Sequence, residues 1–127
     1  MRAASSNAAR TTARTMDGSM RKHVLRQSDD GKTVNIALGD ELLLHLAENP
    51  TTGYGWEFSS PLEATGVSLL YDTFEPPTSR NDGAGGLRIL TLRAQKKGQT
   101  ILKLAYRRPW EREEDTPMRI TFTLNIM

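Results

Sequence analysis

The 127-residue chain contains no cysteine. A disulfide framework, thiol catalysis and zinc sites built on thiolates are therefore excluded. No run approaches the roughly 18 apolar residues of a membrane-spanning helix, and the first 20 residues lack the apolar core of a secretory signal peptide. We expect a soluble protein with no membrane partner, and its compartment stays open between the cytoplasm and endolysosomal vesicles.

Residues suited to catalysis are also scarce. The chain has two histidines; we expect His23 in an N-terminal tail and His45 on the polar face of a strand. No serine lies in a nucleophile-elbow motif, and the segment Gly83–Gly86 lacks the lysine and the following helix of a phosphate-binding loop. The acidic residues between 111 and 115 are interpreted as a solvated charged face. Because no spacing is typical of a metal site, neither an enzyme nor a cofactor is expected.

Positive charge is concentrated at the start of the chain. Residues 1–22 hold five basic side chains against Asp17 alone, whereas residues 23–127 hold 12 basic and 14 acidic side chains. A nucleic-acid partner needs a basic face on the folded part, so none is expected. The Ala-, Ser-, Thr- and Arg-rich first segment is loosely like a transit peptide, but we favour a disordered extension or a cloning remnant over residues 1–22. Residues 23–127 then form one domain, expected to be monomeric.

The rest of the chain is dominated by strand patterns. Apolar and polar residues alternate with period two, which is typical of half-buried strands. About seven strands are expected, over residues 33–38, 42–47, 56–58, 67–74, 90–94, 102–106 and 118–126. The only helical candidate is a short turn over residues 62–67. Short strands separated by turn residues predict an all-β fold, an immunoglobulin-like antiparallel β-sandwich.

Three of the connections are longer and more unusual than the others. If successive strands run in opposite directions, residues 49–55, 76–86 and 107–117 emerge at one end of the sandwich. The links at the other end, around Gly39-Asp40 and Lys97-Gly98, are short. Specialised loops gathered at one end of a rigid scaffold indicate a binding surface.

The first of these connections should be ordered before it binds anything. Pro50 fixes its own φ and favours an extended Asn49, and the two following threonines are stiff at χ1. Gly53 permits a tight bend. We expect a small, polar, rigid protrusion, with an ordinary Asn-Pro turn as the alternative. Trp56 is expected to return the chain to the core.

The other two connections offer different chemistry. Gly83–Gly86 has almost no side chains, so its backbone could pair with that of a partner, and the alternative is a flexible hairpin loop. Residues 108–110, Arg-Pro-Trp, combine the two residue types most enriched at interface hot spots. The alternative for Trp110 is that it folds back over the open end of the core.

Taken in order, Asn49–Trp56, Gly83–Gly86 and Arg108–Trp110 resemble the motifs of the chagasin family of cysteine-protease inhibitors, with no departure inside them. The resemblance extends from about Lys32 to Met127. It implies an immunoglobulin-like sandwich that inhibits papain-family proteases reversibly, cathepsin L-like enzymes first and cathepsin B-like enzymes as further candidates. The residues expected to contact the protease are Asn49, Pro50, Thr51, Thr52, Gly53, Tyr54, Gly83, Ala84, Gly85, Gly86, Arg108, Pro109 and Trp110.

The resemblance also implies how these residues are used. Thr51 and Thr52 would lie nearest the target cysteine, Gly83–Gly86 would pair along one wall of the cleft, and Trp110 would pack on the other. Two alternatives stay open at this level. One is a non-inhibitory immunoglobulin-like module that recognises a surface protein or a glycan, because fold does not determine function. The other, more remote, is an enzyme with a concealed pair of acids.

Overall fold

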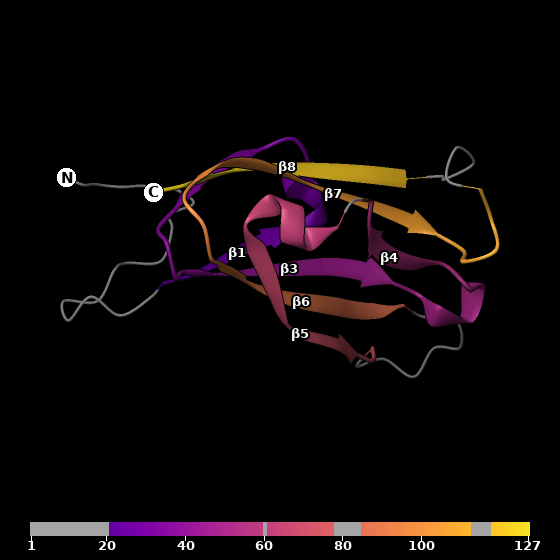
Figure 1. Ribbon diagram of the computed structural model, residues 1–127. Helices are drawn as coiled ribbons and strands as arrows, with labels where there is room; N and C mark the ends of the chain where they lie inside the picture. The colour runs from indigo at the N-terminus through magenta and orange to yellow at the C-terminus, as the bar shows by residue number, and fades with distance from the viewer. Residues whose placement is uncertain (1–20, 60, 78–84, 113–117) are drawn as a thin grey trace.

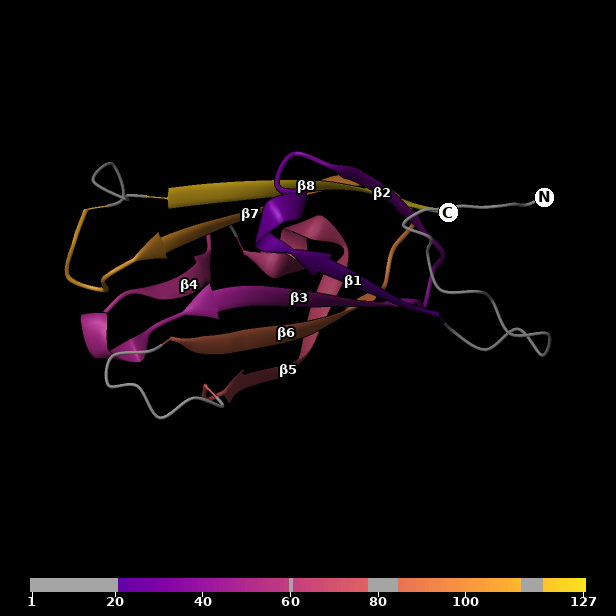
Figure 2. The same cartoon turned by 180° about the vertical axis from the view of Figure 1, so that it is seen from behind.

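The computed structural model describes residues 21–59, 61–77, 85–112 and 118–127. The chain folds into two stacked layers of strands (Figures 1 and 2). The strands are β1 (Lys22–Arg26), β2 (Thr33–Ile36), β3 (Glu41–Glu48), β4 (Gly55–Phe58), β5 (Val67–Glu75), β6 (Gly86–Ala94), β7 (Gly98–Arg107) and β8 (Met118–Ile126). Single 3₁₀ turns, η1 (Gln27–Asp29), η2 (Pro50–Thr52) and η3 (Leu62–Thr65), connect some of them. Within these described ranges there is no α-helix, and no helix is long and apolar enough to cross a membrane.

Each layer is a four-stranded sheet. One sheet has the order β1-β3-β6-β5 and the other β2-β8-β7-β4. The expected all-β sandwich is confirmed, but two edges depart from the antiparallel expectation, because β1 pairs with β3 and β2 pairs with β8 in parallel. The reason is connectivity. A tight hairpin forces neighbouring strands to be antiparallel, whereas β1 and β3 are separated in sequence by β2, which lies in the other sheet.

The core follows the period-two pattern of the sequence. Alternate side chains of each sheet point between the layers, where they bury apolar surface. The most deeply buried are Leu42, Leu44, Leu46, Leu90, Leu92, Leu102, Leu104, Phe122 and Leu124. Trp56 is also buried, as expected for a residue that returns the chain to the core. Leu38 is not part of this set, since β2 already ends at Ile36 and Leu38 is 46% exposed in the following turn.

The strand β1 corrects the expectation that His23 lies in a tail. His23 and Leu25 are the buried positions of this strand. The His23 ring lies 2.9 Å from the buried carboxylate of Asp40 (Nε2 to Oδ2), a contact between residues far apart in sequence. A five-residue strand with only two apolar residues has too weak a period-two signal to be separated from its polar flank. The strand also includes Lys22, one residue before the expected domain boundary.

The three unusual connections leave the sandwich at the same end. In Figure 1, β3, β5 and β7 run toward the right and end there, and β4, β6 and β8 start there. The chain segments between these strand ends include residues 49–54, the described part of 76–85 and residues 108–112. The turns at the opposite end join β2 to β3 and β6 to β7.

Candidate functional site

Residues 49–54, here called the wedge, form a compact turn that the local sequence encodes. The Asn49 side chain accepts hydrogen bonds from the backbone N–H of Thr51 (3.1 Å) and from its hydroxyl (2.7 Å). The Thr52 hydroxyl donates to the Asn49 carbonyl at 2.8 Å. Pro50 begins the 3₁₀ turn η2, and Gly53 ends it in the left-handed region at φ 82°, where a side chain would be strained. The wedge is therefore a pre-ordered protrusion with exposed threonines at its tip.

Aromatic residues pack between the wedge and the core of the sandwich. The ring of Tyr54 stacks on that of Tyr106, with centroids 5.4 Å apart, and Tyr106 in turn contacts the buried Trp56 at 4.9 Å. The Tyr106 hydroxyl accepts a hydrogen bond from the backbone N–H of Asn49 at 3.2 Å. Ring contacts at these distances add to the stabilisation from burial. The side of Tyr54 that faces the sandwich is thus occupied by the protein's own residues.

Arg108 joins the third connection to the wedge. Its Nε donates to the Thr52 carbonyl at 3.1 Å, and its guanidinium lies 4.4 Å over the ring of Tyr54 and 5.9 Å over that of Trp110. Trp110 is 72% exposed, so it does not close the open end of the core. A Cβ built on Gly53 would lie 3.1 Å from Trp110 Cη2. The wedge and residues 108–110 therefore form one continuous surface.

The second connection is only partly visible. Gly83 and Ala84 lie outside the described residues. Gly85 packs on the base of the wedge, where an added Cβ would meet the Glu48 carbonyl oxygen at 3.3 Å. Gly86 is already the first residue of β6, in register with Glu48, and its close approach to Phe74 leaves no room for a side chain. The described glycines thus bring β6 against both the wedge and β5.

An ion-pair network below the wedge was not anticipated from the sequence. Arg88 donates to Glu48 (Nη1 to Oε1, 2.8 Å) and makes a two-pronged contact with Asp72 (2.5 and 2.8 Å). The hydrogen bond to Asp72 is the largest cause of a raised Arg88 pKa; burial opposes it, and Glu48 adds to it. A signal was present, because Glu48 and Arg88 occupy inward positions in line with Leu46 and Leu90. Polar residues at inward positions are found with partners.

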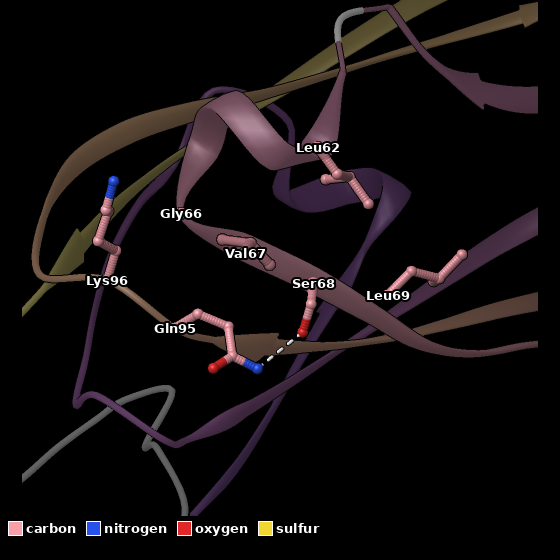
Figure 3. Close-up of a pocket in the computed structure, with 7 residues that line it drawn as sticks. All are labelled: Leu62, Gly66, Val67, Ser68, Leu69, Gln95 and Lys96. Atoms are coloured by element: carbon pink, nitrogen blue, oxygen red, sulfur yellow. Dashed lines mark hydrogen bonds between the residues drawn. The ribbon is translucent and has the colours of Figure 1, made fainter.

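One concave feature of the described residues lies away from these loops. A pocket of about 550 Å³ lies at the other end of β5 and β6, lined by Leu62, Gly66, Val67, Ser68, Leu69, Gln95 and Lys96 (Figure 3). Its polar side is closed by a hydrogen bond from Gln95 to the Ser68 hydroxyl at 2.9 Å. Among the described residues, no group of three His, Asp or Glu side chains could hold a metal ion. The wedge, by contrast, projects from the end of the sandwich (Figure 1), which suits it to filling a cleft in another molecule.

Comparison with known proteins identifies relatives over most of the chain. The family model described as chagasin family peptidase inhibitor I42 matches residues 35–126. Amoebiasin-2 of Entamoeba histolytica is 34% identical over 106 residues, which cover 82% of this chain and 85% of that protein. Chagasin of Trypanosoma cruzi is 30% identical over 107 residues, covering 80% and 96% respectively.

A solved structure is similar to this chain in fold as well as in sequence. The crystal structure of the cysteine protease inhibitor EhICP2 from Entamoeba histolytica superposes with a TM-score of 0.73 at 34% identity. The match covers 84% of this chain and 96% of that one.

Proposed function

This chain belongs to the chagasin family of peptidase inhibitors, and on that premise we propose that it inhibits papain-like cysteine proteases reversibly, without a covalent bond. The observation that carries the proposal is the single surface formed by the wedge and residues 108–110. A rigid protrusion loses little conformational entropy on binding, which favours affinity. In this proposal the inhibitor acts as a monomer, and the loops at one end of the sandwich occlude the active-site cleft of the target protease.

In this proposal the conformation of the wedge backbone makes it a poor substrate for the target protease. A papain-like enzyme attacks the carbonyl of an extended peptide whose oxygen lies in an oxyanion hole. In the wedge the carbonyls of Asn49 and Pro50 accept the N–H groups of Thr52 and Gly53, both at 3.1 Å. The Thr52 carbonyl accepts from Arg108. These carbonyls point into the turn and its support, so the tip fills the cleft without presenting a substrate-like strand.

The three connections have separate roles in this proposal. Thr51 and Thr52, exposed at the tip, lie nearest the catalytic cysteine of the target. The segment Gly83–Gly86 runs along one wall of the cleft, and Trp110, backed by Pro109 and Arg108, packs on the other. Contact of this extent would bury about 1,600 Å² in total, the standard size of a specific interface.

An inhibition panel tests the proposal. The chain is titrated against papain, a cathepsin L-like enzyme and a cathepsin B-like enzyme, with a serine protease as the control. We expect reversible inhibition of the cathepsin L-like enzyme and of papain, weaker or equal inhibition of the cathepsin B-like enzyme, and no effect on the serine protease. Absence of inhibition of every cysteine protease at micromolar concentration would contradict the proposal.

Trp110→Ala tests the surface itself. Because Trp110 is 72% exposed, its removal should change the free energy of unfolding by no more than about 0.5 kcal/mol. As a hot-spot anchor it should weaken binding to papain by about 2 kcal/mol, roughly 30-fold. Tyr71→Ala is the matched control, since Tyr71 is an exposed aromatic residue on β5 at 64%. Equal loss of affinity in both variants would argue against Trp110 as an anchor.

A further inference from the structure

The base of the wedge lies at a weak point of the architecture. Its first flank, β3, belongs to one sheet and its second flank, β4, to the other. No ladder of backbone hydrogen bonds therefore joins the two strands that carry the wedge, unlike a hairpin. The orientation of the wedge relative to the scaffold depends on side-chain contacts between the layers.

Glu48 supplies one of these contacts. Its carboxylate, nine-tenths buried, accepts the backbone N–H of Trp56 at 3.0 Å, so the last residue of β3 is tied to the second residue of β4. Trp56 returns the contact, since its indole Nε1–H donates to the Ala47 carbonyl at 2.8 Å. Together the two bonds close the base of the wedge across the gap between the sheets.

Arg88 links these contacts at the base of the wedge to the strands on either side of residues 76–85. From β6, two residues after Gly86, its guanidinium reaches Glu48 on one side and Asp72 of β5 on the other. The strands β5 and β6 flank the connection of residues 76–85. One planar cation with a forked set of donors thus holds the base of the wedge and both flanks of the neighbouring connection, a geometry that lysine cannot reproduce.

We propose that Arg88 is a positioning residue for inhibition: by bridging Glu48 and Asp72 it fixes the wedge relative to β5 and β6, so that the wedge meets a protease cleft in one orientation. The inference rests on the proposed function. A binding loop that is less ordered before it binds costs more conformational entropy on association, and most mutational changes in affinity are seen in the dissociation rate. Loss of Arg88 therefore loosens the wedge before binding and shortens the life of the complex with the protease.

Two variants and two measurements test this role. Arg88→Met keeps an unbranched apolar stem and removes both ion pairs, and Asp72→Asn is a milder change, because Asp72 is partly exposed. Amide hydrogen exchange of Thr52, Gly53 and Trp56 is followed by NMR in the free protein. The dissociation rate of the complex with papain is measured separately. For Arg88→Met we expect about tenfold faster exchange at these amides and about tenfold faster dissociation.

The matched control is Arg93→Met. Arg93 lies on the same strand and pairs with Glu41 of β3 at 2.9 Å, but at the end of the sheet remote from the wedge. This variant should leave both measurements within about twofold of the unmodified chain. Exchange at Leu104 in β7 should not change in any of the variants, which separates a local effect from general destabilisation.

The outcomes separate the two claims. Faster exchange and faster dissociation in Arg88→Met and, to a smaller extent, in Asp72→Asn support the positioning role. Unchanged exchange at the wedge, or equal effects in Arg93→Met, overturn it. If Arg88→Met does not fold, the same comparison is decided by Asp72→Asn. If the unmodified chain does not inhibit papain, the proposed function fails, whereas the exchange measurements still decide whether Arg88 orders the wedge.

Discussion

At the scale of single residues, Asp40 carries a carboxylate into the interior next to the edge strand β1. Burial favours its neutral form, but hydrogen bonds from His23 and from the backbone N–H groups of Arg21 and Ala37 outweigh that effect. The pKa of Asp40 consequently lies below its ordinary value of 3.8. The sequence showed only a turn residue after Gly39, because its partner His23 lies in β1 and Arg21 just before it, and β1 is brought to β3 by parallel pairing.

Asp40→Asn should reveal this interaction through pH. With a folded-state pKa below the unfolded value, the unfolded chain binds a proton first, so the stability from Asp40 is complete above pH 3.8 and is lost as the pH falls through the folded value. At neutral pH the variant should lose about 2 kcal/mol of unfolding free energy, as expected for hydrogen bonds to a charged group. Its stability should also fall less steeply below about pH 4. Urea unfolding across this range measures both, and parallel pH profiles would contradict the assignment.

At the scale of elements, β1 shows how a short strand becomes part of the core. Leu25 is 6% exposed and packs among the buried residues, whereas its neighbour Val24 points outward at 41%. Leu25→Ala should therefore lower the free energy of unfolding by about 2 kcal/mol or more. Val24→Ala, the matched control, should change it by no more than about 0.5 kcal/mol. Similar effects in urea unfolding would mean that β1 does not stabilise the sandwich.

The other elements were predictable to the extent that their periodicity was strong. Strands such as β3 and β8, with three or more alternating apolar residues, were expected at nearly their observed bounds. The turn of the wedge could also be predicted from the sequence, because Asn49, Pro50 and Gly53 each favour a particular local backbone conformation. The contacts that support the wedge could not be predicted, because Arg108 and Thr52 are 56 positions apart in the sequence and Arg88 and Glu48 are 40 apart. Only the stacking of the two sheets brings such pairs together.

At the scale of the whole molecule, the boundary between residues 1–20 and the sandwich can be tested by truncation. The structure places Arg21 at the start of the framework, since its N–H donates to Asp40 and its carbonyl accepts from Glu41. A chain that begins at residue 21 should keep the urea midpoint and the inhibition constant of the full chain. Deletion through Arg26 removes β1 and should lower the midpoint. A loss of stability on removing only residues 1–20 would show that this segment contributes to the fold.

The sequence by itself determined which residues are buried in the strongly alternating strands, β3 and β8 among them, and where the wedge turns, because both follow from local restrictions: period-two alternation and the backbone limits of Asn-Pro and glycine. Its three motifs in order also indicated the family. The tertiary structure alone decided the rest: the parallel edges, the His23–Asp40 contact, the exposure of Trp110, and the bridge from Glu48 through Arg88 to Asp72. These depend on how two sheets stack and which strand lies at each edge, and contacts across such distances leave only weak traces in the local order of residues.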